Sequence, residues 1–475
     1  MLKISTTPKS LTEAPKKYCR LVLTDKPTSV HRFVEAADGV TEYRMGAGKP
    51  TSMTVRTFRT LVRSFVQAAK SHQVEFLAID IESVRFKTLE SEGGAWLTST
   101  LVENLLLADY EFTTYKTKKD KSNKLTEVLL CGKLSAEETT GLKRGLIVGE
   151  YTNKARDIAN TPACDMTPTD LAEAAKSLAK GTKMTVTVLG EKELKKLKMG
   201  ALLAVGQGTK SETKLIIAEY WGAGKPTAKS AKSLAPIVLV GKGITYDTGG
   251  LNVKPSGSMH DMHLDMSGGS SVLATIAAAA KMGLKKNIVA LVPSAENAIS
   301  AEAMRAGDIV TAMNGKTIEV LHTDAEGRMV LADALTYSER YSPRAIIDVA
   351  TLTGAALAAL GQQASAIMSK DDAMVATLQK LGEKSGDLVW PLPLWDEYKQ
   401  YIKSSRADIS NIATNFSRFG GTIEGGTFLS YFAPKNVPWT HIDIAPRMES
   451  ISGDKLAKGS TGEPVRLLIS YVEQA

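Results

Sequence analysis

Several charged residues in the second half of the chain are of the types that hold metal ions. They are Lys242, Asp247, Lys254, Asp265, Asp324, Glu326 and Arg328. Carboxylates that lie a few ångströms apart cannot all stay ionised unless cations compensate them. Carboxylate oxygens suit Zn²⁺, Mn²⁺ or Mg²⁺, and two such ions would balance the charge of four carboxylates. Because paired metal ions can deprotonate a water and polarise a scissile carbonyl, these residue types indicate hydrolysis.

The charged clusters come directly after short apolar runs that we predict to be strands. These runs are Ile237–Val240, Thr317–Leu321 and Ala345–Ala350, and each is followed by Gly, charged or hydroxyl residues. In an open α/β sheet, ligands bind at the edge formed by the carboxyl ends of the strands. We therefore expect the four carboxylates to meet at one edge of a sheet.

Other kinds of site fit the sequence poorly. Gly241-Lys242-Gly243 lacks the upstream glycine and the following Ser or Thr of a phosphate-binding loop. There is no Gly-x-Ser-x-Gly elbow, which disfavours a serine hydrolase, and no His-Glu-x-x-His helix, which disfavours the commonest one-zinc peptidases. His260 and His263 have a spacing that could suit a metal, but we favour surface or supporting roles for them.

The chain after residue 160 alternates short β-branched runs with helical segments. Further strands are predicted at Met184–Leu189, Leu215–Glu219 and Asn287–Val292, and helices at Thr167–Leu178 and Met329–Tyr337. Such alternation predicts an α/β fold with a mostly parallel central sheet covered by helices.

The first 135 residues also mix strands and helices. We predict strands at Arg20–Leu23 and Val74–Ile81, and helices at Val55–Ala69 and Leu97–Leu107. These elements indicate a separate N-terminal α/β domain.

The densest basic run of the chain is Lys116–Lys124. We predict that it is an exposed loop joining two strands at Tyr110–Tyr115 and Leu125–Leu130. It contains no aromatic residue on which a base could stack, so we do not expect it to bind nucleic acid.

A long helix is predicted at Ala136–Ala159, with Ser135 as its N-cap and Glu138 three residues later. We therefore divide the chain into a variable N-terminal α/β domain at 1–135, a linker helix at 136–160 and a second α/β domain at 161–475. The second domain carries the charged clusters.

The composition is that of a globular protein. Of 475 residues, 43% are hydrophobic and 23% charged, which excludes a fibre or a wholly disordered chain. The formal charge of +8 is mild and does not by itself call for a nucleic-acid partner. No apolar run approaches the roughly 20 residues that span a bilayer, and we expect no membrane association. Three scattered cysteines and the absence of a signal-peptide pattern favour reduced thiols and a cytoplasmic location.

The motifs resemble those of the leucyl aminopeptidase (cytosol aminopeptidase) family. The segment VGKGITYDTGGLNVK at 240–254, followed by Asp265, resembles the family's first metal-binding segment. HTDAEGRMVLADAL at 322–335 looks like its signature, and ATLTG at 350–354 also matches. The resemblance is close over about residues 157–468 and faint in the N-terminal region.

The resemblance implies a two-metal exopeptidase that removes N-terminal residues from peptides through a water bridged by the metals. The residues similar to ligands of one metal are Lys242, Asp247, Asp265 and Glu326, and those of the other are Asp247, Asp324 and Glu326. The implied ions are Zn²⁺ or Mn²⁺, with Co²⁺ and Mg²⁺ as alternatives. Lys254 is implied to stabilise the developing oxyanion, and Arg328 to hold a bicarbonate that shuttles a proton.

The resemblance also implies a substrate pocket and an oligomeric state. The pocket positions are Met262, Thr351, Leu352, Gly354, Ala445 and Met448, and their mainly apolar character favours leucine-like side chains. The family is usually hexameric, so a homohexamer is implied. The chain departs from the family pattern at His322, where Asn is usual, and at Pro446 and Arg447, where Gly and an apolar residue are frequent.

Overall fold

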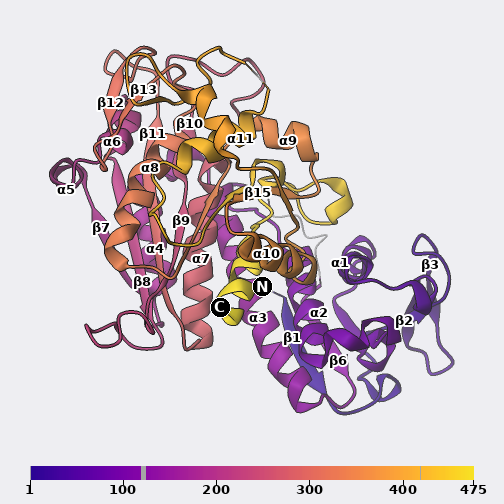
Figure 1. Cartoon of the computed structure of the whole chain (residues 1–475). Coiled ribbons are helices and arrows are strands. Elements are labelled where there is room, and N and C mark those ends of the chain that lie inside the picture. The colour runs from indigo at the N-terminus through magenta and orange to yellow at the C-terminus, as the bar shows by residue number, and fades with distance from the viewer. Residues whose placement is uncertain (1, 119–124, 418) are drawn as a thin grey trace. The chain divides into compact units, whose positions relative to one another are not determined.

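The computed structural model describes residues 2–118, 125–417 and 419–475 (Figure 1). The chain divides into two compact units. The first contains Met1–Asn153 and Ser450–Lys458, and the second contains Lys154–Glu449 and Gly459–Ala475. Within the described residues, no helix is both long enough and apolar enough to cross a membrane.

The first unit is built on a six-stranded sheet. Its order is β1 (Lys3–Thr7), β6 (Glu127–Cys131), β5 (Phe76–Asp80), β2 (Cys19–Thr24), β4 (Thr41–Gly46) and β3 (His31–Glu35). All neighbours pair in parallel except β3 and β4, which are antiparallel. The helices α1 (Val55–Ser71) and α2 (Gly94–Asp109) pack on each other and share a hydrophobic core with the sheet.

One predicted element of this unit is wrong. Tyr110–Tyr115 is not a strand, and β6 is not half of a hairpin. Because β6 lies between β1 and β5 and pairs in parallel with both, neither of its edges is left for a hairpin partner. Residues 119–124 of the predicted basic loop lie outside the described residues.

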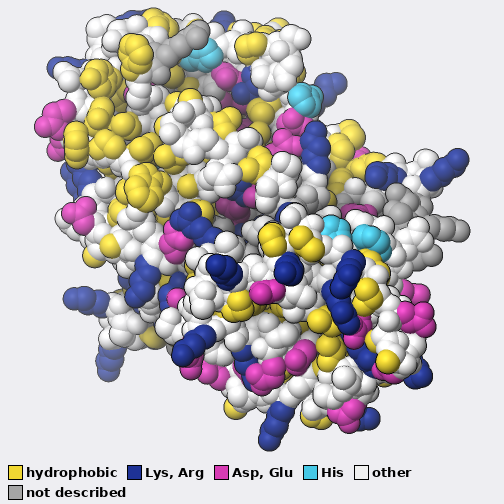
Figure 2. All heavy atoms as spheres, turned by 90° about the vertical axis from the view of Figure 1, so that its right-hand side faces the viewer, with side chains coloured by type: hydrophobic (Ala, Val, Ile, Leu, Met, Phe, Trp, Pro, Cys, Tyr) yellow, Lys and Arg dark blue, Asp and Glu magenta, His cyan; other side chains and the backbone are white. Residues whose placement is uncertain are grey.

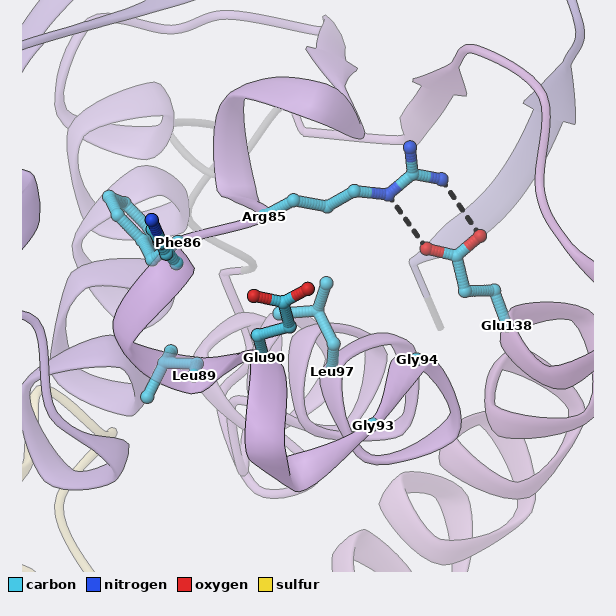
Figure 3. Close-up of a pocket in the computed structure, with 9 residues that line it drawn as sticks. Arg85, Phe86, Leu89, Glu90, Gly93, Gly94, Leu97 and Glu138 are labelled. Carbon is cyan, nitrogen blue, oxygen red and sulfur yellow. Dashed lines mark hydrogen bonds and ion pairs between the residues drawn. The ribbon is translucent and has the colours of Figure 1, made fainter.

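The long helix α3 (Ala136–Asn160) begins as predicted. The Ser135 N–H donates to Glu138 Oε2 at 2.8 Å, and the Glu138 N–H donates to Ser135 Oγ at 3.1 Å. Arg85 forms a two-pronged ion pair with the same Glu138 carboxylate, at 2.9 and 2.8 Å (Figure 3). Arg85 and Glu138 line one side of a cavity of about 320 Å³ in the first unit.

The second unit contains a nine-stranded sheet. Its order is β16 (Val389–Pro391), β15 (Ser365–Ser369), β18 (Trp439–Asp443), β14 (Ala345–Ala350), β9 (Ile237–Gly241), β11 (Asn287–Asn297), β8 (Lys214–Trp221) and β7 (Thr185–Leu189), with β10 (Gly243–Asp247) paired to β11. The central strands β18, β14, β9 and β11 are parallel. On one side β8 pairs antiparallel with β11 and β7 antiparallel with β8, and on the other side β15 pairs antiparallel with β18. The prediction of a mostly parallel α/β sheet is confirmed.

Helices cover both faces of this sheet. One face packs on α6 (Gly200–Gly206), α8 (Gly327–Ser338) and α11 (Gly421–Leu429), which share a core with alternate residues of the strands. A second group of helices packs around α7 (Ser267–Met282), which contacts α4 (Pro168–Ala179) and α12 (Val465–Gln474). The helix α12 also contacts α10 (Asp372–Ser385). Both α7 and α8 contact β9, β11 and β14, so the centre of the sheet is buried on both sides.

The predicted strand at Thr317–Leu321 does not belong to the central sheet. It forms β13 (Thr317–Glu319) in a small sheet with β12 (Ile309–Thr311) and β17 (Ile409–Ser410). The central strands are already hydrogen-bonded on both edges, so β13 finds its partners elsewhere. The loop after β13 nevertheless reaches the edge at which β9 and β14 end, as the contacts below show.

Charges of both signs are mixed on one face of the protein. On the face presented in Figure 2, Lys and Arg side chains are interspersed with Asp and Glu side chains. Among the described residues of this face, there is no concentrated basic stripe of the kind that a nucleic-acid-binding surface has.

Candidate active site

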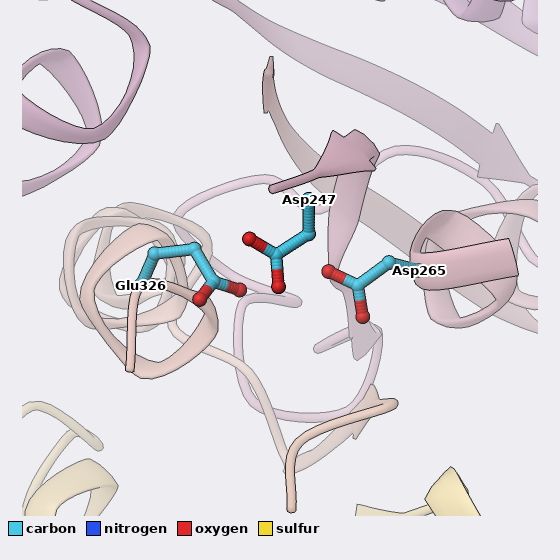
Figure 4. Close-up of side chains that lie close together, drawn as sticks. All are labelled: Asp247, Asp265 and Glu326. Atoms are coloured by element: carbon cyan, nitrogen blue, oxygen red, sulfur yellow. The ribbon is translucent and has the colours of Figure 1, made fainter. Parts of the chain in front are cut away.

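Three buried carboxylates converge from three separate elements of the second unit. Asp247 is the last residue of β10, Asp265 lies in the 3₁₀ turn Met262–Met266, and Glu326 immediately precedes α8. One oxygen of each lies within 4.8 Å of the others, and Figure 4 shows the three carboxylates facing one another. The prediction that separate charged clusters meet at one place holds for these three.

Lys242 lies among these acids and is 2% exposed. Its Nζ is 2.7 Å from Asp265 Oδ2 and 2.8 Å from Glu326 Oε1, and it donates to the Thr351 carbonyl at 3.1 Å. The start of α8 passes close to this lysine at Gly327. A Cβ at that position would lie 2.6 Å from Lys242 Nζ, so a larger residue there would force the end of the lysine side chain to shift.

A second lysine joins the remaining carboxylate to the cluster. Lys254 Nζ is 2.8 Å from Asp247 Oδ2 and 2.6 Å from Asp324 Oδ1. Asp324 is the most exposed of the four acids, with 28% of its side chain accessible. All four predicted carboxylates and both lysines thus form one connected group.

The environment makes Glu326 and Asp265 reluctant to ionise. Burial, followed by repulsion from Asp247, raises the pKa of Glu326 to about 8. Burial also raises the pKa of Asp265 to about 6, against the opposing effect of Lys242. Burial alone would lower the pKa of Lys242, but the carboxylates of Asp265, Glu326 and Asp247 outweigh it and raise that pKa.

The donor set fits divalent cations. Glu326 Oε2 is buried and has no hydrogen-bond partner among the described residues. Such an atom is costly unless a cation or a donor meets it. Carboxylate oxygens together with one amine nitrogen suit Zn²⁺ or Mn²⁺, so the residues present fit metal ions that would satisfy this oxygen.

Two asparagines that the sequence analysis did not single out orient the cluster. Asn297 donates its amide N–H to Asp247 Oδ1 at 2.8 Å. Asn411 accepts from the Leu321 N–H at 2.8 Å and donates to the His322 carbonyl at 2.7 Å, which fixes the loop that carries Asp324 and Glu326. Neither asparagine lies in a charged motif, so no local signal distinguished them.

Arg328 is placed differently from the other predicted site residues. It is buried in the first turn of α8 and does not line the cavity described below. Its Nη1 donates to the Asn411 carbonyl at 2.7 Å, while its Nε is buried without a hydrogen-bond partner among the described residues. That orphaned donor fits a small anion such as bicarbonate.

The metal-binding candidates open into a cavity of about 410 Å³. The six residues predicted to contact substrate, Met262, Thr351, Leu352, Gly354, Ala445 and Met448, all line it. Pro255, Ser258, Thr353 and Leu357, which were not predicted, line it as well. The structure therefore brings the charged cluster and a largely apolar wall into one cavity.

The three histidines near the motifs do not join the carboxylate group. His260 forms an exposed pair with Asp261 at 2.7 Å, and His263 contacts the His260 carbonyl. His322 accepts a hydrogen bond from the Asp324 N–H at 3.3 Å, through Nδ1. His322 therefore supports the loop backbone beside Asp324.

Comparison with known proteins matches two stretches of the chain. Residues 153–469 match the model of the cytosol aminopeptidase family, catalytic domain, and residues 43–119 match the N-terminal domain of that family. The chain belongs to the cytosol aminopeptidase family. It is therefore a hydrolase, a metal-dependent aminopeptidase that acts on peptides.

Individual relatives extend over most of the chain. A probable cytosol aminopeptidase of Azoarcus sp. (strain BH72) is 41% identical over 430 residues, which is 90% of this chain and 83% of the relative. A probable cytosol aminopeptidase of Paraburkholderia phymatum is 39% identical over 454 residues, which is 94% of this chain and 87% of the relative.

Solved structures share the whole fold. The bottromycin maturation enzyme BotP in complex with Mn superposes with a TM-score of 0.84 at 29% identity and covers 100% of this chain and 99% of its own. A mutant of tomato leucine aminopeptidase gives a TM-score of 0.88 at 28% identity, and the match covers 100% of this chain and 97% of the tomato chain.

Proposed function

We propose that this aminopeptidase prefers peptides whose free N-terminal residue is leucine or another apolar residue, and that it uses two divalent metal ions. The observation that carries the proposal is the buried group of Lys242, Asp247, Asp265 and Glu326 in the same cavity as an apolar wall. Ions held there would activate a water and polarise the scissile carbonyl.

The two ions would share two of their ligands, Asp247 and Glu326. One would be held by Lys242, Asp247, Asp265 and Glu326, and the other by Asp247, Asp324 and Glu326. Zn²⁺ or Mn²⁺ suits these donors best, with Co²⁺ and Mg²⁺ as alternatives. Lys242 must lose its proton to act as a ligand, and neighbouring cations would favour that loss.

Lys254 and Arg328 would handle the charges that develop during hydrolysis. Lys254 reaches the cavity with its ammonium held by Asp247 and Asp324, from where it can donate to an oxygen that becomes negative. Arg328, held by the Asn411 carbonyl, would bind bicarbonate, which would accept a proton from the attacking water. A substrate contact at the Leu352 backbone would come from its carbonyl, because its N–H donates to Asp443.

The apolar wall sets the preference for the N-terminal side chain. Met262, Gly354, Ala445 and Met448 offer methyl, methylene and thioether surface and no charge. A leucine-sized side chain would gain hydrophobic contact there, whereas a charged one would lose its hydration.

An aminoacyl-amide panel tests this function. Purified protein loaded with Mn²⁺ or Zn²⁺ should release leucine and methionine from their anilides faster than aspartate or lysine, and it should not cleave N-acetyl-leucine anilide. Chelation should abolish release, and added metal should restore it. Faster release of aspartate than of leucine would contradict the proposed preference, and activity that survives chelation would contradict the metal requirement.

We propose further that the chain is a cytoplasmic homohexamer. Trp390, Trp395, Tyr401, Phe416 and Phe419 are large hydrophobic side chains exposed on the isolated chain, as expected of surfaces that another copy covers. The cytoplasmic location is supported by the naming of the curated relatives as cytosol aminopeptidases. Light scattering of the metal-loaded protein should give six times the 50.9 kDa chain mass, and a monomer mass would contradict the assembly.

A further inference from the structure

Asp443 is a buried acid beside the cavity but not in its lining. It is the last residue of β18 and is 0% exposed. Strands β18 and β14 are parallel neighbours in which Ala350 pairs with Asp443. The loops that follow these two strands therefore leave the sheet side by side, with Asp443 between them.

The Asp443 carboxylate is bonded to both of these loops. Its Oδ1 accepts from the Leu352 N–H at 3.0 Å, in the loop after β14, and from the Ala445 N–H at 3.1 Å, in the turn after β18. Its Oδ2 accepts from the Thr353 hydroxyl at 2.7 Å. Leu352, Thr353 and Ala445 all line the cavity.

We propose that Asp443 is a positioning residue that fixes the spacing between these two walls and thereby sets the selectivity for the N-terminal side chain. This inference rests on the proposed apolar preference. Asp443 acts through the backbone of Leu352 and Ala445, so it touches neither substrate nor metal.

A carboxylate suits this task because it is a compact acceptor with two oxygens. Charge-assisted bonds to backbone N–H groups are short and strong, which holds both loops at defined distances. Without the carboxylate, the Leu352 and Ala445 N–H groups lose a common acceptor. The two walls would then relax independently, and a leucine side chain would lose contacts that alanine never makes.

The test compares side-chain selectivity in Asp443→Ala with that of the wild-type protein. For the variant, the ratio of kcat/KM for leucyl over alanyl anilide should fall by about tenfold, mainly through KM for the leucyl substrate. Asp443→Asn keeps one acceptor oxygen for the Leu352 and Ala445 N–H groups, so its ratio should return toward the wild-type value. Asp443→Ser, which is too short to reach both loops, serves in the same role as Asp443→Ala if the alanine variant does not fold.

Asp333 provides the matched control. It is also a fully buried acid, and it accepts from the Leu202 and Met313 N–H groups at 2.9 and 2.7 Å, away from the cavity lining. Asp333→Ala should lower the melting temperature and leave the leucyl-to-alanyl ratio unchanged.

Two kinds of failure are distinguishable. If wild-type protein does not favour leucyl over alanyl anilide, the proposed preference fails, and this inference falls with it. If the wild type favours leucine but Asp443→Ala or Asp443→Ser keeps the same ratio, or loses both activities equally, the positioning role alone is overturned.

Discussion

Lys242 Nζ lies 2.8 Å from Glu326 Oε1, and both side chains are almost fully buried. The Lys242 ammonium supplies part of the positive charge that these carboxylates need. The same lysine and glutamate are the proposed ligands of one metal ion. Loading the site must therefore break the pair and expel the lysine proton.

Metal binding should accordingly release protons and tighten with rising pH. Burial raises the pKa of Glu326 to about 8 and that of Asp265 to about 6, so a metal ion must displace any proton that these carboxyls hold, besides the proton of Lys242. For each proton that metal binding displaces, the affinity of the site for the metal falls about tenfold when the pH is lowered by one unit. Titration calorimetry at pH 7 in two buffers of different ionisation enthalpy should show at least one proton released per chain. Identical heats in both buffers would contradict the ion-pair exchange.

Glu326→Gln should remove the proposed bridge between the two ions while nearly preserving the side-chain shape. We expect kcat/KM to fall by more than the roughly 10–100-fold typical of residues that only support a metal ligand. Elemental analysis should find less metal per chain than in the wild type. Glu339→Gln, which alters an exposed glutamate just after α8, is the control and should leave both measurements unchanged. Full activity in Glu326→Gln would rule out the bridging role.

Lys254→Met tests stabilisation of the developing oxyanion. Loss of one such donor typically lowers kcat by about 10²–10³-fold. Because the proposed contact strengthens only in the transition state, KM for leucyl anilide should change much less than kcat. Metal content should be measured on the same samples, since Lys254 also pairs with Asp247 and Asp324. Lys281→Met, at an exposed position near the end of α7, is the matched control. A change confined to KM would refute the assigned role.

The chemistry of the site was more predictable than the topology that builds it. Lys242, Asp247 and Glu326 lie in motifs whose residue types demand compensating cations, so the local sequence indicated a metal centre. The strand at Thr317–Glu319 was also recognisable, but its residues do not encode which partners it pairs with. Its place in the small sheet depends on β12 and β17 and on the occupied edges of the central strands.

The supporting residues escaped prediction for a related reason. Asn411 and Asp443 act through contacts with residues about 90 positions away in the chain, at His322 and Leu352. A single Asn or Asp at a strand end most often caps a local turn, and nothing nearby distinguishes these two. Only the folded sheet brings their partners within hydrogen-bonding distance.

A final prediction concerns the buried pair of His441 and Asp348, both of which are 0% exposed. Asp348 Oδ1 bonds His441 Nδ1, and Asp348 Oδ2 accepts from Trp439 Nε1 at 2.6 Å. Burial alone would lower the pKa of His441, but the carboxylates of Asp348 and Asp443 outweigh it and raise that pKa. A histidine whose pKa is raised by folding contributes stability that is fully present below its unfolded pKa of about 6.5 and is lost as pH rises through the folded pKa.

His441→Gln should therefore destabilise the protein by about 3–5 kcal/mol at pH 6, because Asp348 is left as a buried charge without its cation. Denaturant unfolding at pH 6 and at pH 9 should show a smaller difference between wild type and variant at the higher pH. The double variant Asp348→Asn with His441→Gln should recover part of the loss, since it buries no charge at this position. His260→Gln is the control, because His260 forms an exposed pair with Asp261 and should change stability little at either pH. If the destabilisation caused by His441→Gln were larger at pH 9 than at pH 6, the buried histidine would be neutral. That result would contradict an ion pair between His441 and Asp348.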